Sequence, residues 1–446
     1  MKSFSSYIRN FSLATLWVLM ASTGFGVIAL GGNFGWNLRI WTVALIVFLV
    51  IRSLRFFAYK GCRIHVVSCT IYLCGYVLVA LLSGLNALDM SLFVQRIVLI
   101  TALGILFIVL TGIRSDEQLL MCINTVMYFG ALCAVIGVID IYFSLYHPDL
   151  FALVHQFDAG EQFIANGVGE LSRYELAIRA RGFFIEPNEF SQYLLLPFGY
   201  FLARVFFPFN ISNSKYFIPI GFFIFLVAQI ASLSRVGILG YLVEFIGVFL
   251  VSKISEVNRS TIINTRSALS IIGFCLVSLM LLYSDEDVMV TANMFVDRMA
   301  TTGTSGDWTI GIRLSTVGIG IDQGFLSWPN FIFGFGAGNL SQTLVNEATT
   351  TNQFVDVFVE NGFIGLFFYT MIIVSVLIRS HRFLKNAKLL VDKRIFSLFV
   401  GAYLAFLGHL VGGMTYPTHM LFFFWINAGL LVAISMHRVN SAPTSK

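Results

Sequence analysis

The sequence predicts an all-α integral membrane protein of about twelve transmembrane helices with two large external loops. Of the 446 residues, 57% are hydrophobic and only 11% are charged, and the mean hydropathy is +0.84. A soluble domain would carry about a quarter charged residues. Apolar runs of roughly 18 to 25 residues recur along the chain, and each is long enough to cross a bilayer as a helix.

The apolar runs give the positions of the helices in a single polytopic membrane domain, residues 1–446. The first run lacks the small-residue cleavage site of a signal peptide, so we expect it to be a span. The predicted helices are 11–30, 36–52, 64–83, 91–113, 118–146, 190–207, 216–233, 236–252, 267–284, 354–378, 395–414 and 419–437.

The lysines predict how these helices are oriented. All eight fall in segments that share one side of the membrane when the N-terminus is cytoplasmic: Lys2, Lys60, Lys215, Lys253, Lys385, Lys388, Lys393 and Lys446. Lysines in short loops are retained in the cytoplasm. Both termini are therefore expected to be cytoplasmic. The net charge of +5 reflects this orientation and does not indicate a nucleic acid partner.

Two predicted outside loops, 147–189 and 285–353, are too long to be simple connectors. Their aromatic residues argue against disorder. The second contains Trp308, Phe325 and Trp328. We expect these loops to form amphipathic segments on the outer membrane surface, where aromatic side chains are well placed.

The outer side is predicted to have arginines but no lysine. Arg179 and Arg181 precede the sixth span, Arg235 begins the eighth, and Arg313 lies in the second loop. A guanidinium makes bidentate hydrogen bonds to phosphate and stays charged, which suits a lipid diphosphate. Each arginine alone could instead pair with a nearby acid or reach lipid headgroups. Arg96 is predicted to lie within a span, where it needs a partner.

The segment 181–189 joins the first long loop to the sixth span. Pro187 is expected to end the preceding structure and Asn188 to cap the next helix. That arrangement would place Arg181 and Glu186 beside a helix N-terminus, which favours anions. The alternative is an ordinary helix start with a surface acid.

Two further short motifs could contact a ligand. Ser234 and Arg235 follow the seventh span in a tight turn whose hydroxyl and guanidinium groups could hold phosphate oxygens. A plain polar hairpin is the alternative. In the second loop, alternating glycines around Gly336, followed by Asn339, allow a tight backbone path and close approach to a ligand.

Metal binding and disulfides are not expected. Asp285, Glu286 and Asp287 have a spacing that can hold a divalent cation, but acids just beyond a span are also ordinary loop residues. We therefore assign no metal site and no cofactor. The six cysteines show no zinc-ligand spacing with histidine.

Four stretches carry a family resemblance. They are RARGFFIEPNEF at 179–190, SLSRVG at 232–237, RLSTVGIGIDQG with FGFGAGN at 313–339, and TNQFVDVFVENGFIG at 351–365. In this order they resemble the O-antigen polymerase and ligase superfamily. This superfamily contains the Wzy-type polysaccharide polymerases and has a glycosyltransferase-C-like membrane architecture.

The resemblance implies a multi-pass glycosyltransferase of the cell inner membrane with its active site facing the periplasm. Its substrate would be an undecaprenyl-diphosphate-linked oligosaccharide, and its pathway the biosynthesis of lipopolysaccharide or a related surface polysaccharide. The expected reaction is transfer of the growing glycan to a new lipid-linked repeat unit, which makes the chain an O-antigen polymerase. A separate chain-length regulator is expected from the family alone, and membrane lipid surrounds the protein.

Two alternatives remain open. Ligases of the superfamily carry a histidine immediately before a motif whose other residues are present here as Asn352, Gly362 and Gly365. In this chain Thr351 occupies the position of that histidine. Threonine cannot act as a general base near neutral pH, which favours a polymerase over a ligase. The second alternative is a polysaccharide flippase or exporter, although polar residues concentrate here in external loops and not near the midplane.

The residues receive the following expected roles. Arg181, Arg235 and Arg313 would hold the diphosphates as negative charge develops. Glu186 is the first choice for the general base. Asp356 and Glu360 follow it, and because they stand four apart on a helix they should share a face. The expected substrate-binding residues are Arg179, Asn188, Ser234, Gly336, Asn339 and Asn352.

Overall fold

The computed structural model describes residues 13–22, 40–58, 68–113, 115–146, 179–184, 186–207, 217–255, 308–343, 350, 352–386 and 393–436. Within these ranges all regular structure is helical. Helices overlap eleven of the twelve predicted spans, and the remaining one, 267–284, lies outside the described residues. Among the described helices, six are long and apolar enough to cross a membrane, which supports an all-α membrane protein.

The described helices follow the chain from a short first helix at 13–21. They are α2 (Ile40–Ala58), α3 (Ser68–Leu82), η2 (Ser83–Asn86), α4 (Met90–Thr111), α5 (Asp116–Tyr146), α9 (Pro187–Phe206), α10 (Phe217–Ala231), α11 (Arg235–Ser255), α14 (Trp308–Gly324), α15 (Trp328–Phe333), α16 (Leu340–Thr343), α17 (Gln353–Lys385), α18 (Lys393–Gly412), η5 (Thr418–Met420) and α19 (Phe422–Ser435).

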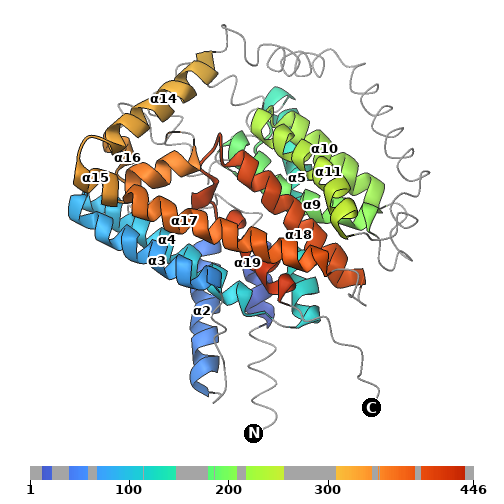
Figure 1. Cartoon of the computed structure of the whole chain (residues 1–446). Coiled ribbons are helices and arrows are strands. Elements are labelled where there is room, and N and C mark those ends of the chain that lie inside the picture. Colours follow the sequence, from blue (N-terminus) through green and yellow to red (C-terminus); the bar gives the residue numbers. More distant parts are fainter. Residues whose placement is uncertain are drawn as a thin grey trace.

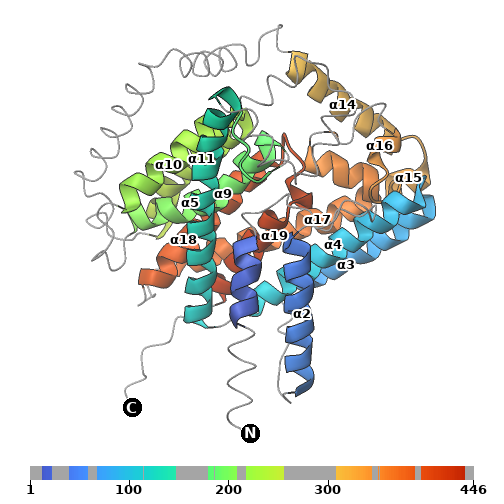
Figure 2. The ribbon, with the colours of Figure 1, turned by 180° about the vertical axis from the view of Figure 1, so that it is seen from behind.

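Two groups of helices flank a central pair. In Figures 1 and 2, α3, α4 and α17 lie on one side, and α5, α9, α10 and α11 lie on the other. Between them, α18 packs against α9 and α11, and α19 packs against α4 and α18. The central pair thus joins segments that are far apart in the sequence.

Small residues let α9 and α18 approach closely. A methyl group on Gly199 would lie 2.8 Å from the carbonyl oxygen of Gly401 and 3.0 Å from the backbone nitrogen of Ala405. Apolar side chains cannot drive helices together in lipid as they do in water, so close packing at small residues supplies much of the association. This contact fixes the second half of α9 against the middle of α18.

The long helix α17 is broken at Gly362, where φ is 68° and ψ is −173°. The break exposes the carbonyls of Val359 and Glu360, which accept hydrogen bonds from the backbone N–H groups of Phe335 (2.9 Å) and Gly336 (3.1 Å). A non-glycine residue with positive φ is strained, and here a Cβ would also lie 2.2 Å from the carbonyl oxygen of Ile332. The glycine-rich loop after α15 therefore docks where α17 opens.

The region predicted as the second long loop contains three helices, α14, α15 and α16. Leu314, Phe325 and Trp328 are exposed there, whereas Thr316 is buried. A segment that buries one face and exposes apolar groups on another is amphipathic. Contact of these exposed side chains with the outer membrane surface remains a prediction.

The described lysines lie at the helix ends that point away from the glycine-rich loop. Lys253 is in the last turn of α11 and Lys385 in the last turn of α17, while Lys393 begins α18. The opposite ends of these helices carry the residues described below. This distribution agrees with the predicted separation of lysines from the candidate site.

Candidate functional site

The segment before α9 is held against the turn between α10 and α11. The backbone N–H of Ala180 donates to the carbonyl of Ala231 (2.9 Å), and Arg179 Nε donates to the carbonyl of Ser232 (2.9 Å). Two of the motifs that carry the family resemblance, separated by about 50 residues, therefore lie side by side. We call Arg179, Arg181, Glu186, Asn188, Ser234 and Arg235 the α9 cluster.

Asn188 connects the two halves of the α9 cluster. Its side-chain oxygen accepts hydrogen bonds from Ser234 Oγ (3.0 Å) and from Arg179 Nη2 (3.4 Å). The expectation that Asn188 caps α9 is wrong, because the helix already begins at Pro187 and Glu186 occupies the capping position. Proline is well suited to the first helical position because the N–H that it lacks would have no partner there. Asn188 is thus free to bind across to the neighbouring turn.

Within the α9 cluster, the charged groups differ in exposure. Arg181 is only 6% exposed, whereas Glu186 and Arg235 are half-buried. The Phe184 N–H donates to the Arg181 carbonyl (2.9 Å), so a turn lies between Arg181 and Glu186 in the sequence. Glu186 Oε2 accepts a hydrogen bond from the hydroxyl of Tyr416 (3.2 Å). Arginine and carboxylate groups at a partly open helix N-terminus can bind an anion and accept a proton.

A second group of polar residues gathers at the start of α17, and we call Arg96, Thr350, Asn352, Asp356 and Glu360 the α17 cluster. Asn352 caps α17, because its side-chain oxygen accepts from the N–H groups of Phe354 (3.0 Å) and Val355 (3.3 Å). Buried Asp356 accepts from both the N–H (2.7 Å) and the hydroxyl (2.5 Å) of Thr350. The cap and the carboxylate together fix the entry of the chain into α17.

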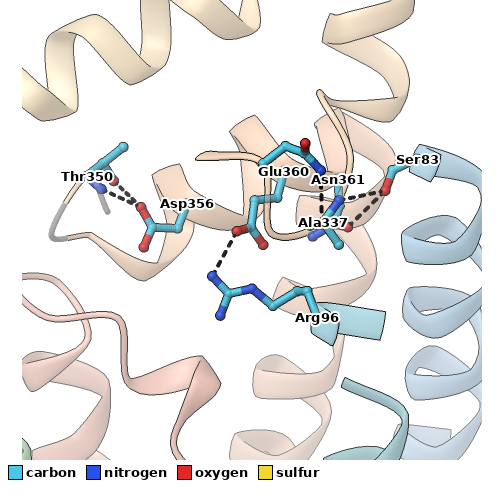
Figure 3. A network of polar contacts seen from close by, with 8 residues as sticks. Ser83, Arg96, Ala337, Thr350, Asp356, Glu360 and Asn361 are labelled. Atoms are coloured by element: carbon cyan, nitrogen blue, oxygen red, sulfur yellow. Dashed lines mark hydrogen bonds and ion pairs between the residues drawn. The ribbon is translucent and has the colours of Figure 1, made fainter. Parts of the chain in front are cut away.

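Glu360 forms an ion pair with Arg96 of α4, with 3.2 Å between Oε1 and Nη2. Glu360 is 1% exposed and the Arg96 side chain is 26% exposed. Figure 3 shows Asp356 turned toward Thr350 and Glu360 turned toward Arg96. The pair supplies the partner that the sequence required for Arg96, and removing either member would leave a poorly solvated charge.

The glycine-rich loop is part of the same framework. Ala337 N–H donates to Ser83 Oγ (3.1 Å), as Figure 3 shows, and Asn339 accepts from the backbone N–H of Asp89. Gly334, Gly336 and Gly338 all have positive φ, which confirms the tight backbone path predicted from their spacing. Asn339 is fully buried and Gly336 is buried, so the main role of both is to hold this loop against α4 and α17.

One loop connects the two clusters. Residues 413–421, between α18 and α19, bind the start of α17 through Asn352 Nδ2 to Met414 O (3.1 Å) and Gln353 N to Gly413 O (2.9 Å). The same loop provides Tyr416, the hydrogen-bond donor to Glu186. The predicted site residues on α9 and α17 are therefore brought to the same end of the bundle.

Sequence reasoning missed the histidine in this connecting loop. His419 is 3% exposed, its ring lies against Tyr369, and neither ring nitrogen has a hydrogen-bond partner within the described part of the chain. Burial, with a smaller contribution from the Arg96 charge, lowers the pKa of His419 to about 3, so the ring is neutral near pH 7. No local pattern pointed to it, because a lone histidine beside an apolar helix has no informative spacing.

Some predicted features lie outside the described residues. Arg313 belongs to α14, but its side chain is not described, and Thr351 is not described at all. The acidic run 285–287 and most of the loop 147–189 also lie outside these ranges. Among the described residues, no group of three or more histidine, cysteine, aspartate or glutamate side chains could hold a metal ion.

No known protein family and no curated protein matches this sequence. The resemblance to O-antigen polymerases and ligases therefore stays a prediction that depends on the four quoted stretches. Three of the four contribute side chains to the α9 and α17 clusters, and the glycine-rich stretch closes over the break in α17.

Proposed function

We propose that this protein is a membrane glycosyltransferase that polymerises undecaprenyl-diphosphate-linked oligosaccharide repeat units. One observation carries the proposal: two separate segments bring three arginines, a half-buried carboxylate and a serine hydroxyl together at one end of an apolar helix bundle. Guanidinium groups suit a diphosphate, and a carboxylate suits an acceptor hydroxyl.

In the proposed reaction, the bond between the anomeric carbon of the growing glycan and its diphosphate carrier breaks. The electron pair leaves with the diphosphate, and the hydroxyl oxygen of a fresh lipid-linked repeat bonds to that carbon. The hydroxyl proton passes to Glu186. The diphosphate is already a good leaving group, so positioning and charge stabilisation provide most of the catalysis.

The geometry favours different roles for the candidate residues. Arg235 is half-buried at the start of α11 and can contact a phosphate oxygen directly. Arg181 is more enclosed and would stabilise the charge of the diphosphate from the protein interior. Arg179 is engaged with Ser232 and Asn188, which makes it a positioning residue.

Among the three carboxylates, Glu186 suits the general base best. It is half-buried and its hydrogen bond comes from the neutral hydroxyl of Tyr416. Asp356 is enclosed with Thr350, and Glu360 is enclosed with Arg96. A general base must come within hydrogen-bond reach of the hydroxyl that it deprotonates, and a half-buried carboxylate is more accessible to a substrate than a buried one. Asp356 and Glu360 would therefore maintain the site and not perform the chemistry.

Deleting the gene in its host and separating the surface glycolipids on a gel tests the proposal. A polymerase predicts a ladder collapsed to core plus one repeat unit, because single units are still ligated. Bare core with polymer left on the lipid carrier would identify a ligase. An unchanged ladder would contradict a role in O-antigen and direct the test to capsule or exopolysaccharide. Lipid-linked repeats that stay on the cytoplasmic side would identify a flippase.

A further inference from the structure

A cavity of about 480 Å³ lies far from both clusters, between the last turns of α17, the start of α3 and the end of α19. Its lining residues come from these three helices and the residue that follows α17: Ser68, Tyr72, Met371, Val374, Ser375, Ile378, Arg379, Arg382, Phe383, Asn386 and Ser435. None of them belongs to the site proposed for glycosyl transfer.

The cavity is at the opposite end of the bundle from that site. Ser83, which follows α3, contacts Asn361 at the break in α17, whereas Ser68 at the start of α3 lines the cavity. On α17, Arg379 lies 17 residues beyond Gly362, or roughly 25 Å along a helix. That separation is close to the roughly 30 Å thickness of a bilayer core. The cavity therefore lies where a second membrane surface is expected.

Within the described residues, neither of the two arginines in the lining forms an ion pair with an acidic side chain. Arg379 is half-buried and Arg382 is exposed. Arg379 and Arg382 lie within one helical turn, and Asn386 follows one turn later. Two guanidinium groups so placed can bind a phosphate group by charge-assisted hydrogen bonds.

The rest of the lining mixes small polar and apolar side chains, and its apolar part on α17 continues toward the middle of that helix. Met371, Val374 and Ile378 recur every three or four residues and so share one face of α17. On the same helix the arginines come later, nearer the end. The cavity thus has a cationic end and an apolar end, in the order in which a phospholipid presents its headgroup and its chains.

We propose that this cavity is a binding site for an anionic phospholipid, with the headgroup phosphate held by Arg379 and Arg382 and the first part of an acyl chain against Met371 and Val374. Basic pockets between transmembrane helices bind anionic headgroups by this combination of charge and apolar contact. A free phosphate would use the arginines alone and leave the apolar lining without a role. The proposal is independent of the glycosyltransferase function.

The test measures phosphatidylglycerol bound to the purified full-length protein by native mass spectrometry, with phosphatidylcholine as the uncharged comparison. Arg379→Gln and Arg382→Gln should each weaken phosphatidylglycerol binding about fivefold, and the double variant about 25-fold. Lys385→Gln is the matched control, because Lys385 is an exposed cation on the same helix that does not line the cavity. It should change binding by less than about twofold.

A cavity-filling variant separates a site from a basic surface. Val374→Trp keeps both arginines but occupies the apolar part of the lining, so phosphatidylglycerol should be lost, with folding checked by the melting temperature of the lipid-free protein. An equal loss of binding in Lys385→Gln would overturn the proposal in favour of diffuse attraction. Unchanged binding in the double arginine variant would also overturn it. Displacement of the lipid by equimolar inorganic phosphate would overturn the lipid assignment.

Discussion

The α9 cluster and the α17 cluster contain the same kinds of side chain but use them differently. In the α17 cluster, Glu360 is 1% exposed and its charge is balanced by Arg96. In the α9 cluster, Glu186 and Arg235 are half-buried, and Glu186 is bonded to a neutral hydroxyl. Breaking an enclosed ion pair destabilises a structure because it leaves an unpaired buried charge, whereas a partly open carboxylate is accessible to a ligand. Enclosure and pairing, more than residue type, separate framework from chemistry here.

The comparison predicts opposite outcomes for two isosteric substitutions. Glu186→Gln should lower the rate of glycan extension by about 10²- to 10⁴-fold, because it removes the proposed general base. Its melting temperature should stay unchanged, since only one hydrogen bond from Tyr416 is affected. The measurement is elongation of a purified lipid-linked repeat unit by purified protein, followed on a gel.

Glu360→Gln is the matched substitution in the α17 cluster. It should reduce stability by about 2 kcal/mol, less than for a fully enclosed pair because Arg96 is 26% exposed and keeps some hydration. Once folded, this variant should retain most of its extension rate. Normal stability together with abolished extension in Glu360→Gln would reverse the assignment of the two clusters.

The break in α17 offers a structural test of how the framework is held. Gly362→Ala combines a positive φ with a Cβ placed 2.2 Å from a backbone carbonyl, so we expect a loss of about 3 kcal/mol or more. Gly318→Ala on α14 is the control, because no atom lies within 4 Å of its Cβ position. That change should be neutral or stabilise the helix by up to about 1 kcal/mol. Thermal unfolding in detergent compares them, and equal melting temperatures would refute the proposed role of Gly362.

Acid should weaken the loop that connects the two clusters. The pKa of His419 is lowered to about 3 in the folded protein, whereas the pKa of histidine in an unfolded chain is near 6.5. At pH values between these two, the unfolded chain binds a proton at His419 and the folded chain does not. The stability contribution of His419 is therefore constant above about pH 6.5 and decreases as the pH falls toward 3. Between pH 7.5 and pH 5 the loss should be about 2 kcal/mol.

Melting temperatures across this pH range test the effect of His419. His419→Leu should reduce the pH dependence, because it removes one buried histidine that the folded protein keeps neutral. His381→Gln removes an exposed histidine of α17 and should leave the curve as it is in the unmodified protein. An identical slope in His419→Leu would show that other groups cause the acid sensitivity.

Local patterns in the sequence predict where the helices lie and where the backbone turns tightly. Long apolar runs predicted eleven helices that the structure contains, because a span needs about 20 apolar residues in one continuous segment. The glycine spacing at 334–338 predicted a tight backbone path for a similarly local reason, and the structure has positive φ at Gly334, Gly336 and Gly338. The start of α9 was predicted wrongly: Asn188 was expected to cap the helix, but the helix begins at Pro187, which is also suited to the first helical position.

Which side chains contact one another depends on the three-dimensional packing of the helices. Arg96 required a partner, but that partner, Glu360, is 264 residues away, and the Thr350 contact of Asp356 depends on how the chain enters α17. Likewise, the loop 413–421 that joins Glu186 to the start of α17 gave no sequence signal. Helix positions follow from local hydrophobicity, whereas these contacts depend on the packing of several helices at once, which hydrophobic periodicity does not encode.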